Sequence, residues 1–256
     1  MLKCWRDMLN AHEMEEVALQ LSHHLRKTAV GEFRMFGGLA CWLHSPGCRA
    51  LFEDERECDL DLYAPTADLL ALQVALKSFG FSRSQREVGT VVAFEFRRRA
   101  KDASQDIHIY LGSLKFSHRV SIGKRIHDDW PTLPLAELLL TKLQIHFPKE
   151  KDLRDICMLL VEHTLGDVDG EIINCRILSE MCGRNWGLWR DATSNLRAVS
   201  EVVESAPLDA NVKKRVREKL HSINQCILDA KKTLVWRARA RIGERFDWWD
   251  PVNEWS

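Results

Sequence analysis

Two aspartates separated by one residue are the sharpest chemical feature of this chain. They lie in ECDLDL (57–62), where alternating polar and apolar residues predict a β-strand. Because successive side chains of a strand point to opposite faces, Asp59 and Asp61 share one face, opposite the two leucines. Paired carboxylates repel unless a cation lies between them, and Mg²⁺ prefers carboxylate, phosphate and water oxygens. The pair predicts a divalent-metal site, whereas a solvent-facing strand is the simpler interpretation of an isolated Asp-x-Asp.

A second alternating strand carries a third carboxylate. In QDIHIY (105–110), Asp106 and His108 share one face and the two isoleucines the other. Two-metal phosphoryl transfer needs a third carboxylate that shares a metal with the first pair and helps to deprotonate the attacking hydroxyl. A lone Asp here would be a solvent-facing residue, but the combination favours a metal site.

A diglycine and an arginine offer contacts to phosphate. Gly37 and Gly38 stand where a short strand passes into a helix, and backbone amides at such a turn can hold an anion. Glycine at such a turn can also serve geometry alone. Arg56 precedes the Asp-x-Asp strand, where it would steer a phosphate or pair with a neighbouring acid.

Two charged positions fall on apolar helix faces. Lys142 lies on or beside the apolar stripe of LPLAELLLTKLQ (133–144), and lysine is seldom buried unless it is paired. It therefore either extends to the surface or faces a site that binds phosphate. Asp155 lies among apolar positions of the next helical segment and needs a cationic partner, which Lys142 or Lys151 would supply.

The elements that position these residues follow from periodicity. The first part of the chain shows helical spacing in two segments and strand alternation in three, with a strand, glycine turn and helix after the first helix. The predicted helices are residues 9–28 and 66–81, the strand–turn–helix is 32–44, and the strands are 58–65, 91–99 and 105–111.

Beyond residues 128–134 the pattern becomes helical. Two helical segments are joined at Pro148, residues 164–170 read as a linker, and residues 211–234 form an amphipathic helix. We therefore predict an α+β protein, with a small mixed sheet and flanking helices in residues 1–130 and an all-helical domain in residues 131–256.

Composition excludes several classes of protein. Of the 256 residues 45% are hydrophobic, and 37 basic residues balance 37 acidic ones, unlike a disordered tail or a protein that coats nucleic acid by bulk charge. No apolar run is long enough to span a membrane and no secretory signal is visible, so we expect a cytoplasmic protein with reduced cysteines. The spacing of Cys157, His163, Cys175 and Cys182 fits no common zinc module and buried free cysteines are common, so we expect no zinc.

A basic segment lies near the end of the chain. Residues 209–247 contain eleven Lys or Arg and five Asp or Glu, a net charge of +6, with Trp and Phe among the arginines. Guanidinium and aromatic groups can hold an RNA backbone and stack on unpaired bases, so an RNA such as tRNA is one predicted partner. Tryptophans that dock onto the protein core are the alternative, and the one that we favour.

The order of these motifs resembles a known family. GG-x-A, R-x-x-DxD, a strand Asp, LPLAELLLTKLQ and KDLRDI together are similar to the minimal nucleotidyltransferases of the DNA polymerase beta-like superfamily, and closest to its AbiEii-like branch. That branch includes toxins of toxin–antitoxin pairs. The resemblance covers residues 31–163, and the helical remainder matches none of the branch's signatures.

The resemblance implies a role for each matching residue. It makes the diglycine a phosphate-binding turn, with Gly38 where the superfamily often has a Ser that contacts phosphate, and places Cys58 where the branch often has Thr or Ser. The implied metal ligands and catalytic residues are Asp59, Asp61 and Asp106; the implied nucleotide-binding residues are Gly37, Gly38, Arg56, Lys142, Lys151, Asp152 and Asp155.

The implied reaction is transfer of a nucleoside monophosphate from an NTP to an acceptor hydroxyl on RNA or protein. Two Mg²⁺ or Mn²⁺ ions would serve as cofactors, and an antitoxin-like protein is an implied partner. A catalytically silent module that binds nucleotide or a partner protein is the alternative. A metal-dependent nuclease is less favoured, because it gives the diglycine and Lys142 no role.

Overall fold

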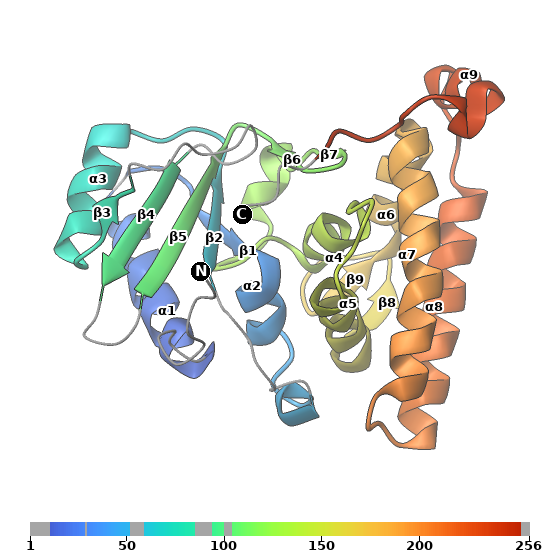
Figure 1. Cartoon of the computed structure of the whole chain (residues 1–256), viewed down its shortest axis with the longest axis horizontal. Coiled ribbons are helices and arrows are strands. Elements are labelled where there is room, and N and C mark those ends of the chain that lie inside the picture. Colours follow the sequence, from blue (N-terminus) through green and yellow to red (C-terminus); the bar gives the residue numbers. More distant parts are fainter. Residues whose placement is uncertain (1–10, 29, 52–58, 85–93, 100–103, 252–256) are drawn as a thin grey trace, which may run out of the picture.

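The structure is a computed structural model that describes residues 11–28, 30–51, 59–84, 94–99 and 104–251. It is an α+β protein in which a five-stranded mixed sheet with flanking helices is followed by a helical C-terminal part (Figure 1). The strand order is β1-β2-β5-β4-β3, with β2 and β5 parallel and the other neighbours antiparallel. The strands are β1 (Arg34–Phe36), β2 (Leu60–Ala64), β3 (Ser82–Arg83), β4 (Phe94–Arg99) and β5 (Ser104–Leu111).

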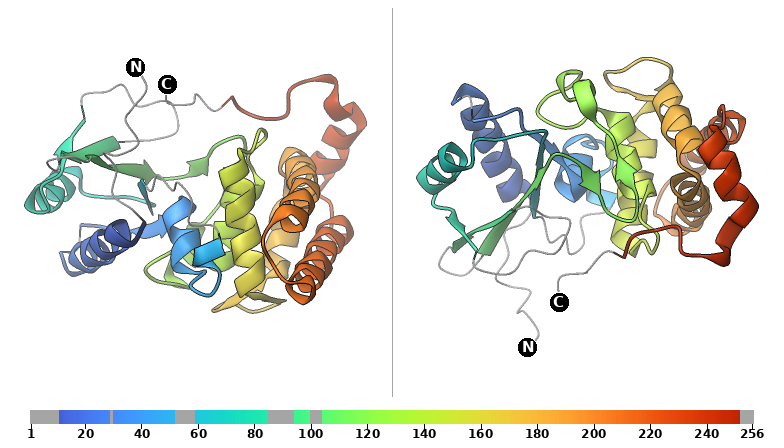
Figure 2. Two further views of the ribbon diagram at one scale, coloured as in Figure 1. Left: turned by 60° about the horizontal axis from the view of Figure 1, so that its bottom comes forward. Right: turned by 90° about the horizontal axis from the view of Figure 1, so that it is seen from above.

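Two helices cover one face of the sheet. These are α1 (Ala11–Lys27) and α3 (Leu69–Ser78), which lie on the same side of the strands (Figure 2). Leu62 of β2 and Ile109 of β5 belong to the same buried core as Leu72 of α3. The apolar positions of the alternating strands therefore face the core, as the sequence predicts, which leaves the polar positions for the other face.

A short helix lies between the sheet and the helical part (Figure 1). Helix α2 (Gly37–Leu43) follows β1 directly, and its buried face joins the core through Leu39 and Trp42. It contacts β1 and β2 on one side and helices α4 and α5 on the other. The diglycine stands at the start of α2, and His44 caps its C-terminus.

The helical part begins with α4, which carries Lys142, and α5, which carries its acidic partners Asp152 and Asp155. Helix α7 packs against α5 and α8, and α8 packs against α6, so that their apolar faces extend the core. The helices are α4 (Leu135–Leu143), α5 (Glu150–Glu162), α6 (Cys175–Arg184), α7 (Trp186–Ser205), α8 (Ala210–Asp229) and α9 (Leu234–Ile242).

Short elements complete the described chain. Two small two-stranded sheets join β6 to β7 and β8 to β9. In the described part of the chain, no helix combines the length and apolar character needed to cross a membrane. The remaining elements are β6 (Leu114–Lys115), β7 (Arg119–Val120), β8 (Thr164–Gly166), β9 (Ile172–Asn174), and 3-10 turns at Arg49–Leu51, Gly123–His127 and Gly243–Arg245.

Two sequence predictions need correction. Residues 164–170 are not a simple linker, because Thr164–Gly166 pairs in parallel with β9. The helix predicted over 211–234 ends at Asp229 and a new helix begins at Leu234, whose side chain is 82% exposed. The apolar spacing continues by chance across the break, while the buried face ends at Ile227.

Candidate active site

Asp61 lies beside a histidine of the neighbouring strand. Strands β2 and β5 pair in parallel with Asp61 opposite His108, and Oδ1 of the aspartate is 3.2 Å from Nδ1 of the histidine. Asp61 is partly exposed between the buried Leu60 and Leu62. The predicted alternation therefore holds from Leu60 to Leu62 and directs Asp61 away from the apolar core, while Glu57 and Cys58 lie outside the described residues.

Asp106 is held by an arginine that the sequence analysis did not single out. Strand β4 is antiparallel to β5 and sets Arg97 opposite Asp106 and Glu95 opposite His108. The guanidinium donates two hydrogen bonds to Asp106, from Nε to Oδ1 at 2.6 Å and from Nη2 to Oδ2 at 2.5 Å. Nη2 also lies 3.4 Å from Oε1 of the buried Glu95. Both oxygens of the predicted third carboxylate are thus paired with a cation.

The cluster shifts the pKa of two of its members. Burial raises the pKa of Asp59 to about 6; nearby His108 opposes that rise, while Asp61 and Asp106 add to it. Burial alone would lower the pKa of His108, but the hydrogen bond to Asp61 and the negative charges nearby outweigh it and raise the pKa to about 9. At neutral pH His108 is therefore an imidazolium within a group of carboxylates.

The diglycine turn touches the Asp-x-Asp strand. Gly37 follows Phe36, which is paired with Asp61 across β1 and β2, and it adopts a φ of +76°. A Cβ atom at Gly37 would lie 2.2 Å from Oδ2 of Asp61, whereas one at Gly38 would lie 3.5 Å from Oδ2 of Asp155. The position therefore requires glycine for both its backbone angle and its close approach to the aspartate.

Lys142 is buried between two carboxylates. Its Nζ lies 2.8 Å from Oδ1 of Asp152 and 2.9 Å from Oδ2 of Asp155. Burial disfavours the ammonium, but the two acids outweigh that effect and hold the pKa of Lys142 above its usual range. The cationic partner expected for Asp155 is thus Lys142. A contact from this lysine to nucleotide stays a prediction.

Of the remaining predicted residues, Lys151 and Asp152 lie near the start of α5, and Arg56 is not among the described residues. Lys151, near the start of α5, is close enough to lower the pKa of Asp59, so this end of α5 lies beside the strand carboxylates. Asp152 accepts a hydrogen bond from the backbone nitrogen of Lys149 at 3.1 Å and from Lys142.

The three aspartates do not yet converge as metal ligands. Asp61 is directed to His108 and Asp106 to Arg97. Among the described residues, the three-residue group whose ligand atoms lie within 4.8 Å of one another is elsewhere, in the helical part and at the end of α2. A shared metal at the aspartates would require Arg97 to release or share Asp106.

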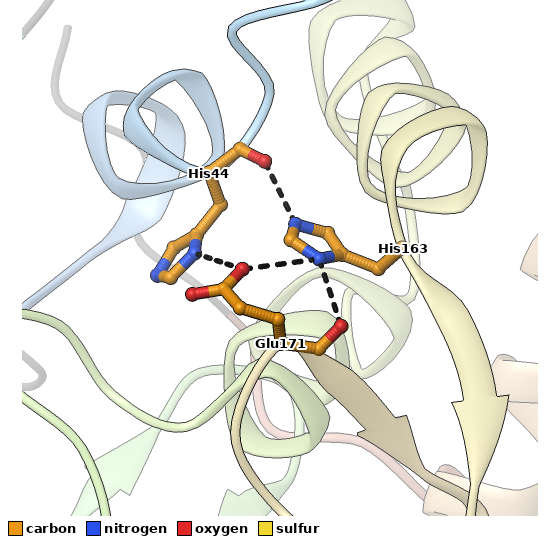
Figure 3. A group of neighbouring side chains, drawn as sticks. All are labelled: His44, His163 and Glu171. Carbon is orange, nitrogen blue, oxygen red and sulfur yellow. Dashed lines mark hydrogen bonds and ion pairs between the residues drawn. The ribbon is translucent and has the colours of Figure 1, made fainter.

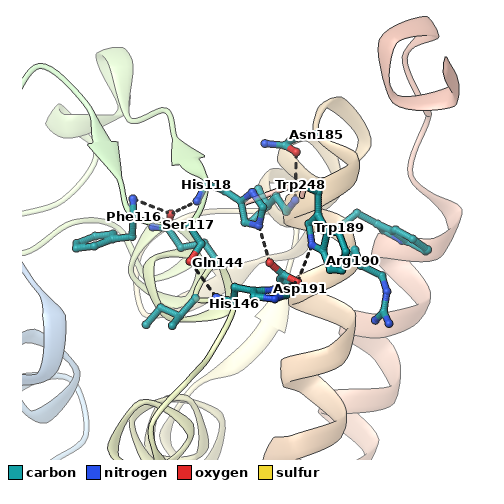
Figure 4. A network of polar contacts seen from close by, with 12 residues as sticks. Phe116, Ser117, His118, Gln144, His146, Asn185, Trp189, Arg190, Asp191 and Trp248 are labelled. Carbon is teal, nitrogen blue, oxygen red and sulfur yellow. Dashed lines mark hydrogen bonds and ion pairs between the residues drawn. The ribbon is translucent and has the colours of Figure 1, made fainter. Parts of the chain in front are cut away.

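The aromatic residues near the end of the described chain pack on the protein. Nε1 of Trp248 donates a hydrogen bond to Oδ1 of the buried Asp191 at 3.0 Å (Figure 4). The same carboxylate contacts Nε2 of His118 at 2.7 Å and Nδ1 of His146 at 2.9 Å. The ring of Trp249 stacks on His146 with a centroid distance of 3.7 Å. These tryptophans dock onto the protein, as the favoured interpretation expects.

The arginines of the same segment are mostly exposed. Arg237, Arg241 and Arg245 face solvent on or just beyond α9, a helix without buried residues. Trp236 packs edge-on against Trp189 with centroids 5.2 Å apart, so its ring is in use within the protein. The segment therefore presents exposed positive charge, whereas its tryptophans pack against other residues of the protein.

No protein-family model matches this chain, and comparisons with curated proteins and with solved structures also find no match.

Proposed function

We propose that this chain transfers a nucleoside monophosphate from an NTP to an acceptor hydroxyl. The observation that carries the proposal is the strand register, which gathers Asp61, His108 and Asp106 on one side of the sheet, with Asp59 within electrostatic reach. The diglycine turn lies directly against Asp61. Carboxylates beside a glycine turn are the groups that hold a metal–triphosphate complex.

The donor set suits Mg²⁺ or Mn²⁺. The ligands offered by Asp59 and Asp61 are hard oxygens, and the charges of Asp61 and Asp106 add to the rise in the pKa of Asp59 that burial causes. When bound, the metal ions would neutralise the triphosphate and lower the pKa of an acceptor hydroxyl. Asp59 and Asp61 would hold them, with Asp106 as a third ligand once Arg97 turns away from it.

The other residues of the cluster have roles that follow from charge and position. The backbone amides at Gly37 and Gly38, at the start of α2, would contact phosphate oxygens. The His108 imidazolium keeps Asp61 oriented through their hydrogen bond. A guanidinium released from Asp106 is well suited to a phosphate, because it can donate two parallel hydrogen bonds.

A silent nucleotidyltransferase-type module is the second candidate, and one observation favours it. Arg97 and His108 already compensate Asp106 and Asp61 without any metal. If these pairs are permanent, the site would bind nucleotide or a partner protein without chemistry. An antitoxin-like protein is such a partner under either candidate function.

An RNA acceptor is part of the proposal. The exposed arginines around α9 and the net charge of residues 209–247 support electrostatic binding to a phosphate backbone. Affinity for a tRNA should therefore fall steeply as salt concentration rises. An affinity that does not change with salt would remove RNA from the proposal.

The first test is calorimetric titration of each NTP with Mg²⁺. We expect at least one NTP to bind the unaltered protein and not the Asp59→Asn/Asp61→Asn variant, while exposed Asp167→Asn serves as the matched control. Binding that is unaffected by the double substitution, or no binding of any NTP, would overturn the assignment of the site.

The second test separates enzyme from silent module. With α-labelled NTP, the enzyme should transfer label to RNA or protein and release pyrophosphate. Nucleotide binding without transfer in Mg²⁺ or Mn²⁺ to either acceptor class would favour the silent module.

A further inference from the structure

Two histidines and a glutamate form a junction between the ends of α2 and α5 and the start of β9 (Figure 3). His44 caps the C-terminus of α2, His163 follows the last residue of α5, and Glu171 directly precedes β9. One ligand atom from each residue lies within 4.8 Å of the others. The junction is at the opposite end of α2 from the diglycine turn.

The hydrogen bonds of His163 leave its Nδ1 atom facing two oxygen atoms of Glu171. Nε2 is 2.7 Å from the carbonyl oxygen of His44, which can only accept, so Nε2 carries the hydrogen. In a neutral ring Nδ1 then bears a lone pair. Its neighbours are two acceptors of Glu171, the carbonyl oxygen at 3.3 Å and Oε2 at 3.4 Å. A lone pair that faces two oxygens is unfavourable, and either a second hydrogen on Nδ1 or a metal ion between these atoms relieves it.

His44 is arranged in the same way. Its Nε2 is 2.6 Å from Oγ1 of the buried Thr132, which can accept a hydrogen bond from it. This leaves the Nδ1 lone pair directed toward Oε2 of Glu171, 4.0 Å away (Figure 3).

Metal-binding histidines characteristically donate the hydrogen of their other nitrogen to an oxygen acceptor, which fixes the ring and the tautomer. Both histidines have such an acceptor. We propose that Nδ1 of His44, Nδ1 of His163 and the carboxylate of Glu171 bind a divalent transition-metal ion, with Zn²⁺ as the best fit.

Two of the ligand–ligand distances lie close to those of tetrahedral zinc. Bonds of about 2.0–2.1 Å at tetrahedral angles place ligand atoms about 3.3–3.5 Å apart. His163 Nδ1 and Glu171 Oε2 are already 3.4 Å apart, and the 4.0 Å from His44 must shorten by about 0.5 Å. The Glu171 side chain is 80% exposed and has room to move. Two imidazoles with one carboxylate favour zinc over Mg²⁺, which prefers oxygen ligands.

The loop that carries Glu171 is anchored through Asp169. Asp169 accepts a hydrogen bond from Nη2 of Arg125 at 2.8 Å and one from Nδ2 of Asn174 at 3.2 Å. The β8–β9 connection is thus fixed on both sides of the ligand. A metal here would join the ends of α2 and α5 to this connection, and three protein ligands would leave one position for water.

The test uses the full chain after removal of metals by a chelator. Zn²⁺ alone should bind with one ion per chain at this site and raise the melting temperature by about 5–10 °C at a hundredfold excess over the dissociation constant. Glu171→Gln should weaken binding by about tenfold or more and reduce the thermal shift. Glu201→Gln changes another exposed acid, on α7; it is the matched control and should change neither the binding nor the thermal shift.

Cobalt distinguishes these ligands from the buried thiols. Co²⁺ should give visible absorption of a tetrahedral nitrogen and oxygen site that His44→Gln abolishes. A near-ultraviolet thiolate charge-transfer band would place the metal at cysteines and overturn the proposal. Failure of Zn²⁺ to bind, or binding that both variants leave intact, would overturn it too. The Asp59→Asn/Asp61→Asn protein should retain the zinc effect, so this test is independent of the nucleotide site.

Discussion

Replacement of Gly37 by alanine isolates the contact that joins the glycine turn to the aspartate strand. The new Cβ atom would lie 2.2 Å from Oδ2 of Asp61, far inside van der Waals contact. The substitution also forces a residue with a side chain to keep a φ of +76°. Two separate penalties therefore act at one position, and each has its own magnitude.

The backbone penalty is the smaller one. A side chain in the left-handed region costs about 1–2 kcal/mol, of which the reduced freedom of the unfolded chain returns about 0.4–1 kcal/mol. The overlap with Asp61 adds about 1–3 kcal/mol, the usual cost of overpacking. We therefore expect Gly37→Ala to lower the free energy of unfolding by about 2–4 kcal/mol.

Two other glycines separate these contributions. Gly112 has a φ of +78° and its Cβ would lie 4.0 Å from the nearest atom, so Gly112→Ala carries the backbone penalty alone, about 1 kcal/mol. Gly38→Ala meets Asp155 at an ordinary 3.5 Å without a positive φ, and should change stability by about 1 kcal/mol or less.

The assay is urea unfolding of each variant with and without Asp61→Ala. In the Asp61→Ala background the overlap disappears, so the cost of Gly37→Ala should fall to that of Gly112→Ala, a coupling of about 1–3 kcal/mol. An equal cost in both backgrounds would show that the turn and the aspartate do not touch. NTP binding by Gly37→Ala should be lost, because Asp61 must move.

Three further predictions concern buried charge. The pKa of His108 is about 9 in the folded protein and about 6.5 in the unfolded chain. Its contribution to stability is therefore complete below pH 6.5 and disappears as the pH rises through 9. In His108→Gln the free energy of unfolding should change less with pH between these two values. Lys142→Met leaves two buried carboxylates facing each other and should cost about 3–5 kcal/mol in urea unfolding. Asp191→Asn should release Trp248, which trypsin cleavage after Arg245 and a red-shifted tryptophan emission would report.

Matched substitutions set the baseline for these three. His221→Gln and Lys77→Met replace exposed residues of the same types and should leave the pH profile and the stability nearly unchanged. Asp250→Asn removes an exposed pair with Lys115 and should not expose the cleavage site. The first prediction would be contradicted if the stability of His108→Gln varied with pH as that of the unaltered protein does. The second would be contradicted if Lys142→Met lowered the free energy of unfolding by less than about 1 kcal/mol. The third would be contradicted if trypsin digested Asp191→Asn and the unaltered protein alike.

Local patterns were enough to predict most elements. The alternation around Asp61 and that of QDIHIY in β5 specify which side of a strand is buried, because that depends only on a period of two residues. The strand–turn–helix at residues 32–44 appears as β1 and α2. The ion pair of Asp155 with Lys142 was also predictable, since a buried acid on an apolar face needs a cation.

Long-range pairing was not predictable in the same way. Arg97 and Glu95 enter the candidate site only because β4 pairs with β5 in one particular register. The alternation in FEFRRR shows that these two residues share a face, but no local pattern shows which strand lies beside them. The convergence of His44, His163 and Glu171 is equally invisible in sequence, because it joins three separate loops.

The parallel pairing of β2 with β5 has a consequence for how the protein folds. Asp61 and His108 are 47 residues apart, and β4 inserts between β5 and β3 in the sheet. Contacts this distant close slowly, because the loop entropy must be overcome first. A register slip of one residue would turn Asp61 of β2 into the core. The candidate site should therefore appear late and all at once during refolding, and nucleotide binding would serve as a probe for chains whose sheet is correctly aligned.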